Sequence, residues 1–163
     1  MTHRAPIGHG LGIARLAAEI DYPPLTGDVK TDVFGILEQL RAAYRRHPLA
    51  QEAEPSNIGP HAVRYLDHMA GALAPTGLDA TATLTGIGLL TGWVRAFAAQ
   101  EGAGLSSHAN MAGLISAMLP RGDYPHLTAL FTTLKSATTP PGTDTAFRTG
   151  IESLLFGIIP TEP

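Results

Sequence analysis

The chain has 163 residues, which suits one domain, and we expect a single domain over residues 1–163 whose first ten residues form a flexible N-terminus. The formal net charge of -3 lacks the basic excess that phosphate neutralisation requires, so direct nucleic-acid binding is not expected. The absence of cysteine excludes disulfides and thiolate metal sites. Without a signal peptide or a long uninterrupted apolar run, the sequence predicts a cytoplasmic protein with no membrane partner.

Hydrophobic residues make up 44% of the chain and charged residues only 15%. This balance excludes a disordered tail and leaves a small soluble protein short of surface charge. We therefore expect part of the surface to be an interface.

Apolar residues spaced three and four apart predict helices in the first half of the chain. A short helix near residues 11–20 is followed, after a Pro-Pro turn, by a longer one at residues 29–46 that Asp28 can cap. The dipole of that helix suits the arginines near its end, Arg41, Arg45 and Arg46. Pro60 at a first helical position indicates a third helix that runs to about Ala74.

The segment from Asp79 to Glu101 predicts a long, buried central helix, with Asp79 as its N-cap. One stripe suits a core and consists of Ile87, Leu90, Val94 and Phe97. A second, flat stripe consists of Gly88, Gly92, Ala96 and Ala99. A glycine inside a helix costs roughly 1 kcal/mol relative to alanine, so another helix, a second copy of the chain or a ligand is expected to pack closely here.

Three further helices are expected in the second half. The first is capped by Ser106 or Ser107 and ends at Pro120, and the second runs from about Leu127 to Leu134. The last, from about Asp144 to Ile159, carries an apolar stripe of Phe147, Gly150, Ile151, Leu154 and Ile158. On a monomer this stripe and the small residues of the central helix would expose a large apolar patch, so we expect a homodimer through these two helices. No strand-like alternation occurs, so the sequence predicts an all-α fold of about seven helices.

The segments ILEQLRAAYRRHPLA, GPHAVRYLDHMAGALAPTGLDATATLTGIGLLTGWVRAFAAQE and DYPHLTALF, followed by the amphipathic last helix, resemble the C-terminal domain of TetR-type transcriptional regulators. The resemblance implies a homodimer, in which the central and last helices of two subunits form a four-helix bundle, and a mostly apolar ligand pocket beneath the third helix. The chain begins where the family's helix-turn-helix head should already have ended. We therefore expect no specific operator binding by this chain, whether the head was removed or is naturally absent.

The helical faces and the resemblance together predict a hydrophobic cavity between the second, third and central helices. Polar groups at its rim would orient a hydrophobic, ring-containing ligand. The alternative is that the same residues close the core without a void. The candidate ligand-binding residues are Ile36, Leu40, Tyr44, Tyr65, Leu66, His68, Met69, Leu84, Gly88 and Trp93.

Two classes of function remain open: a small-molecule binding module, and an enzyme of cyclase or isomerase type acting on a natural-product intermediate in the same pocket. No G-x-S-x-G motif is present, and His61 and His68 are spaced poorly for a metal site, so neither a cofactor nor a metal is expected. No catalytic residue can be named from the sequence. Arg95 is expected to pair with Glu101 or across a dimer, and the histidines of the third helix to be solvated.

Overall fold

The computed structural model describes residues 13–48, 59–104, 113, 115–117, 119–136 and 143–159. Every regular element in these residues is helical, which confirms the predicted all-α fold. The expected flexible N-terminus at residues 1–10 lies outside the described residues, as does much of the helix expected between Ser106 and Pro120.

The helix boundaries agree closely with those expected. The α-helices are α1 (Ile13–Ala18), α2 (Val29–Arg46), α3 (Pro60–Leu73), α4 (Ala80–Gly102), α6 (Pro125–Ser136) and α7 (Thr143–Ile158), with short 3-10 helices η2 (Ala74–Thr76) and η3 (Leu119–Arg121).

The starts of α2, α3 and α4 follow from local sequence chemistry. The Asp28 carboxylate accepts a hydrogen bond from the Thr31 amide at 2.7 Å, and the Asp79 carboxylate accepts one from the Ala82 amide at 2.8 Å. Both aspartates therefore act as the predicted N-caps, satisfying amides that have no partner inside the helix. Helix α3 begins with Pro60, as predicted.

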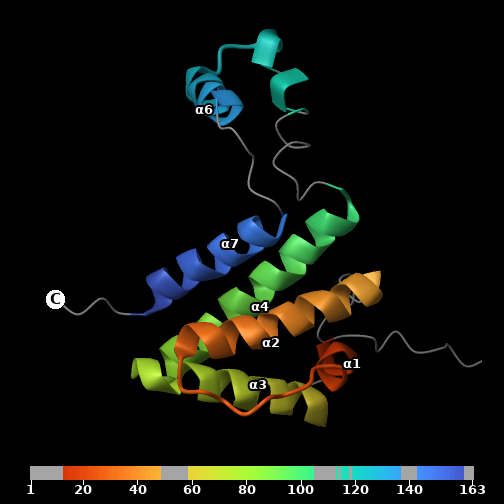
Figure 1. Cartoon of the computed structure of the whole chain (residues 1–163), viewed down its shortest axis with the longest axis vertical. Coiled ribbons are helices and arrows are strands. Elements are labelled where there is room, and N and C mark those ends of the chain that lie inside the picture. The colour runs from red at the N-terminus through yellow and green to blue at the C-terminus, as the bar shows by residue number, and fades with distance from the viewer. Residues whose placement is uncertain are drawn as a thin grey trace, which may run out of the picture.

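The core lies among α1, α2, α3, α4 and α7, which pack as a bundle (Figure 1). Helix α2 contacts α1, α3, α4 and α7, while α3 contacts α1 and α4. Helix α6 lies outside this bundle in Figure 1. Helix α4, with α7 on one side and α2 on another, is therefore a central element, as the sequence predicted.

Helix α4 has one buried and one exposed face. The predicted core stripe is confirmed, because Ile87, Leu90, Val94 and Phe97 are at most 3% exposed. The open face of α4, the name used below for the opposite side, comprises Leu84, Gly88, Leu89, Gly92 and Ala96, all exposed. The prediction that α4 is buried is therefore right for one face only.

The glycines of α4 differ in their surroundings. A Cβ atom added to Gly86 would lie 3.1 Å from a side-chain carbon of Ile158, so α7 packs closely there. A Cβ atom added to Gly88 or Gly92 would have no neighbour within 4 Å among the described residues. Within this chain, close packing thus explains Gly86 but not Gly88 or Gly92.

The apolar stripe of α7 points inward. Phe147 and Ile151 are fully buried, and Leu154 and Ile158 pack against the same core. The prediction that the stripe forms an exposed dimer surface was therefore wrong. Helix α7 packs against α4 and α2 of its own chain. The exposed apolar residue of α7 is Phe156, at 76% exposure.

Among the residues that the structure describes, we find no helix whose length and hydropathy would let it span a membrane.

Candidate ligand-binding site

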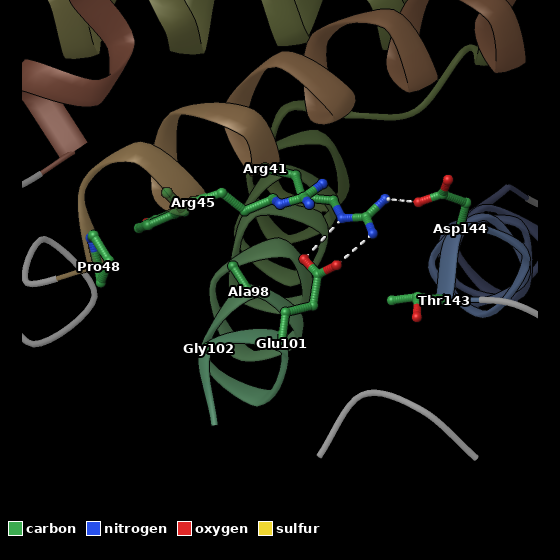
Figure 2. A pocket seen from close by; sticks show the side chains of 9 residues that line it. Arg41, Arg45, Pro48, Ala98, Glu101, Gly102, Thr143 and Asp144 are labelled. Carbon is green, nitrogen blue, oxygen red and sulfur yellow. Dashed lines mark hydrogen bonds and ion pairs between the residues drawn. The ribbon is translucent and has the colours of Figure 1, made fainter. Parts of the chain in front are cut away.

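A pocket of about 410 Å³ lies where the C-terminal ends of α2 and α4 meet the N-terminal end of α7 (Figure 2). Its volume falls in the range of roughly 300 to 1,000 Å³ that is common for small-molecule sites. The wall consists of Arg41, Tyr44, Arg45 and Pro48 from α2 and its end, Ala98, Glu101 and Gly102 from α4, and Thr143 and Asp144 from α7.

Arg41 forms a buried ion-pair network in this wall (Figure 2). Its Nε donates to one carboxylate oxygen of Glu101 at 2.9 Å, and a terminal nitrogen donates to the other at 2.5 Å. The remaining terminal nitrogen lies 2.9 Å from Asp144 Oδ1. The side chains of Arg41 and Glu101 are 8% and 12% exposed, whereas that of Asp144 is 82% exposed. The network therefore joins α2, α4 and α7 around one guanidinium.

Aromatic rings complete the surroundings of Arg41. Its guanidinium carbon lies 4.5 Å from the ring centroid of Phe147 and 5.2 Å from that of Phe97, distances typical of cation–π contacts. The hydrogen bond to Glu101 raises the pKa of Arg41, burial opposes the rise, and Asp144 adds to it. Arg41 is therefore a permanently charged part of the wall whose nitrogens are already engaged.

Arg45 lies one helical turn after Arg41, and its side chain extends toward that of Arg41 in Figure 2. No residue within the described ranges forms an ion pair with it. Beside it, Tyr44 is only 3% exposed, and burial raises the pKa of its phenol, opposed by the nearby charge of Arg95. The Tyr44 hydroxyl thus stays protonated at neutral pH and can donate a hydrogen bond.

Five of the ten predicted ligand-binding residues lie together in the core. Ile36, Leu40, Tyr44, Tyr65 and Met69 are each at most 3% exposed and belong to one apolar cluster, and Leu66 packs at its edge. The Tyr65 hydroxyl and Thr91 Oγ1 are hydrogen-bonded at 2.7 Å, and burial raises the pKa of Tyr65. Of this set, Tyr44 is the residue that also lines the pocket.

The structure separates the other four predicted residues from that cluster or places them at its margin. Leu84, at 63% exposure, and Gly88 lie on the open face of α4. Trp93 packs against the core beside Phe97, with ring centroids 5.6 Å apart, and its ring covers Gly150 of α7. The His68 ring meets the Tyr22 ring edge-on at 5.0 Å, so His68 is not the solvated residue that was expected.

Two predicted rim residues carry buried nitrogens that find no hydrogen-bond partner in the described part of the chain, namely His68 Nε2 and Trp93 Nε1. Buried polar atoms are usually paired, so each of these nitrogens calls for an explanation. Their neighbours belong to different elements, since His68 meets Tyr22 before α2 and Trp93 meets Gly150 in α7. The two unpaired nitrogens therefore lie in different surroundings, and a single small ligand is not needed to explain both.

A second pocket, of about 400 Å³, lies between the start of α2 and the end of α7. Its wall includes the exposed ring of Phe156 and the ion pair between Lys30 and Glu152, whose nearest atoms are 2.6 Å apart. None of the ten predicted residues lines it.

Comparison with known families supplies the identity of this bundle. The family model described as the tetracyclin repressor-like C-terminal domain matches residues 23–161. The chain belongs to this family. No curated protein matches the sequence.

The helical arrangement therefore is a TetR-like small-molecule-binding fold, as the sequence resemblance implied. The ion-pair network in the TetR-like domain was missed from the sequence, which indicated helix-end cations on α2 and a pair of Arg95 with Glu101 or across a dimer. The structure shows Arg41 as a partner of Glu101. The two residues are 60 positions apart and follow no local spacing rule, so no sequence signal could have paired them.

Candidate metal ligands do not gather in the described part of the TetR-like domain. No group of three His, Asp or Glu side chains there is arranged to hold an ion. The chemistry of the pocket is thus that of two guanidinium groups, a phenol and two carboxylates that already bind Arg41.

Proposed function

We propose that this TetR-like domain binds a hydrophobic, ring-containing small molecule as a homodimer, and that the ligand site includes the pocket beside Tyr44. The observation that carries the proposal is the position of Tyr44, which lines the 410 Å³ pocket and also belongs to the buried cluster of Leu40, Tyr65 and Met69. An aromatic ring at such a boundary offers an apolar surface and one polar atom to a ligand.

In this proposal the ring system of the ligand lies on Tyr44 and Ala98 and extends toward the predicted apolar residues of α2 and α3. The Tyr44 hydroxyl gives it orientation, since a few placed polar groups in an apolar pocket provide specificity. The C-terminal domains of this family typically bind small molecules, which supports the same class of function for this chain.

The proposed dimer uses the open face of α4 together with the outer side of α7. Support comes from Leu84 at 63% exposure, Leu89 at 50% and Phe156 at 76%, because large exposed apolar side chains favour association. Gly88 and Gly92 lie on the same open face and leave room for a partner helix to approach the backbone. A second copy of the chain supplies such a helix with a matching face.

The alternative function is an enzyme of cyclase or isomerase type in the same pocket. Such an enzyme needs an acid or base whose pKa lies near neutral pH. In the walls of the two pockets, three groups have shifted pKa values, and each shift is away from neutral pH. The pKa values of Arg41 and Tyr44 are raised, and hydrogen bonds from Thr31 lower that of Asp28. Binding is therefore the function that the described residues support best.

The proposed site can be tested by filling the pocket at Gly102, which lines it and has open space around an added Cβ atom. Gly102→Phe should abolish binding of N-phenylnaphthylamine, a neutral ring probe whose fluorescence rises in apolar surroundings. The thermal stability of the Gly102→Phe variant should stay close to that of the unmodified chain, because the new ring enters open space in the pocket.

The matched control is Gly35→Phe, which adds the same ring at another helical glycine with open surroundings, outside the pocket. This variant should bind the probe normally. Unchanged probe affinity in Gly102→Phe would remove this pocket from the ligand site.

A further inference from the structure

We propose that the ligand carries one anionic group and that Arg45 binds this group at the mouth of the pocket. The inference rests on the proposed function, because it names the chemical class of ligand for the same site. That class is a ring compound bearing a single carboxylate or another acid group of the same charge.

The first argument concerns how the arginines at the end of α2 are engaged. Arg46 donates to Glu19 at 2.9 Å, and Arg41 is held by Glu101 and Asp144. Arg45, between them in the sequence, has no ion-pair partner among the described residues. It is thus the arginine of this group with its guanidinium available to a ligand.

The carboxylates in the pocket wall do not satisfy Arg45. Both oxygens of Glu101 accept hydrogen bonds from Arg41, and Asp144 directs one oxygen to the same guanidinium. The second oxygen of Asp144 belongs to a side chain that is 82% exposed, where water screens its charge. The negative charge of the wall is therefore directed to Arg41, and none of the described carboxylates pairs with Arg45.

The spacing of Arg45 and Arg41 also favours an anion beside them. Like charges four residues apart on a helix repel each other, and Arg41 and Arg45 have this spacing. The negative end of the α2 dipole offsets part of this repulsion. An anion in the pocket would offset it further, and a guanidinium presents paired donors that match the two oxygens of a carboxylate.

Tyr44 completes the arrangement as a neutral donor. Tyr44 and Arg45 line the same pocket, and Arg95 adds positive charge near the phenol. A ligand with its ring on Tyr44 and its acid group beside Arg45 would satisfy both features of the wall at once.

Two probes with the same ring system separate charge recognition from apolar binding. Anilinonaphthalene sulfonate carries one negative charge, and N-phenylnaphthylamine lacks it. We expect the chain to bind both in the pocket, the sulfonate more tightly. Arg45→Gln should raise the Kd of the sulfonate by about tenfold, the effect of losing a hydrogen bond to a charged group, and leave the Kd of the neutral probe unchanged.

The control is Arg15→Gln, which removes one positive charge from an exposed site on α1 away from the pocket. It should change neither Kd, and a thermal melt should show that both variants are folded. An unchanged ratio of the two Kd values in Arg45→Gln would overturn the inference and leave Arg45 as a partner of the helix dipole alone. If the unmodified chain binds neither probe, the proposed function itself is overturned.

Discussion

The two faces of α4 contain similar residues but meet different surroundings. On the inner face, Leu90 is fully buried in the core shared with α2 and α7, whereas its neighbour Leu89 on the open face is 50% exposed. Glycines show the same contrast, since Gly86 packs against Ile158 while Gly92 has open space. Small and apolar residues in a helix thus indicate close packing without telling whether the partner belongs to the same chain.

Helix α4 has apolar residues on both its buried and its exposed face, and this distribution indicates how many packing partners the helix has. A helix with one apolar face has its partners within the domain, whereas a helix that is apolar on two sides needs a second partner. In this protein the second partner is the proposed second subunit. Substitutions on the two faces should therefore affect different properties.

The largest effect on folding is expected from Leu90→Ala compared with Leu89→Ala. Removing the fully buried Leu90 side chain leaves a cavity and should lower the free energy of unfolding by about 2 to 5 kcal/mol. Leu89→Ala should change the folding of the subunit by less than about 0.5 kcal/mol, because exposed positions tolerate substitution.

Chemical denaturation of the two variants at the same protein concentration measures this difference. Equal losses in both variants, at concentrations where the chain is monomeric, would contradict the assignment of the two faces.

A smaller loss is expected where α7 contacts the inner side of α4. A Cβ atom added to Gly150 would overlap the ring of Trp93, so Gly150→Ala forces the two helices apart and should cost about 1 to 3 kcal/mol. Gly157 lies in the same helix with open surroundings, and Gly157→Ala should stabilise the chain by up to about 1 kcal/mol through helix propensity.

Thermal unfolding should therefore shift in opposite directions for these two variants. A stabilised Gly150→Ala variant would show that Trp93 moves away from α7 without loss of packing.

The smallest effect on the subunit, but the decisive one for assembly, is expected from Gly92→Phe. Within one chain an added side chain at Gly92 has open space, so the fold should change by less than about 0.5 kcal/mol. In the proposed dimer the same ring would enter the helix contact and convert the protein to monomers.

Light scattering at micromolar concentration measures the mass of both forms, and Gly35→Phe, with the same added ring away from the open face, should remain dimeric. A monodisperse monomer for the unmodified chain would exclude the dimer, and a dimeric Gly92→Phe would place the interface elsewhere.

The fold could be predicted from the sequence because its determinants are local. The aspartates at positions 28 and 79 cap their helices, Pro60 begins α3, and the core stripe of α4 repeats with the helical period. The direction of the α7 stripe was wrong for a physical reason. Periodicity shows that a helix has an apolar face, but Phe147 and Ile151 could equally have met another subunit.

The candidate site was less predictable because its contacts join distant segments. Tyr44 was predicted to lie at the rim of a ligand cavity, and it does line the pocket, while ligand binding by Tyr44 stays a prediction. Arg41 was taken as a helix-end cation, since nothing near it in the sequence reveals that Glu101 and two aromatic rings will surround it. Leu84 and Gly88 have the helical spacing of pocket residues, but the rotation of α4 turns them outward.

The contact between Trp93 and Gly150 also gives the protein an intrinsic optical reporter. Trp93 is the single tryptophan of the chain, so its emission arises from one known place, the junction of α4 and α7. Its indole nitrogen is buried and finds no hydrogen-bond partner within the described residues, and an indole in such dry surroundings emits at shorter wavelength than one in water. Any event that separates α7 from α4 admits water to this ring and shifts the emission to the red, so helix movement in the unlabelled protein can be followed by its own fluorescence.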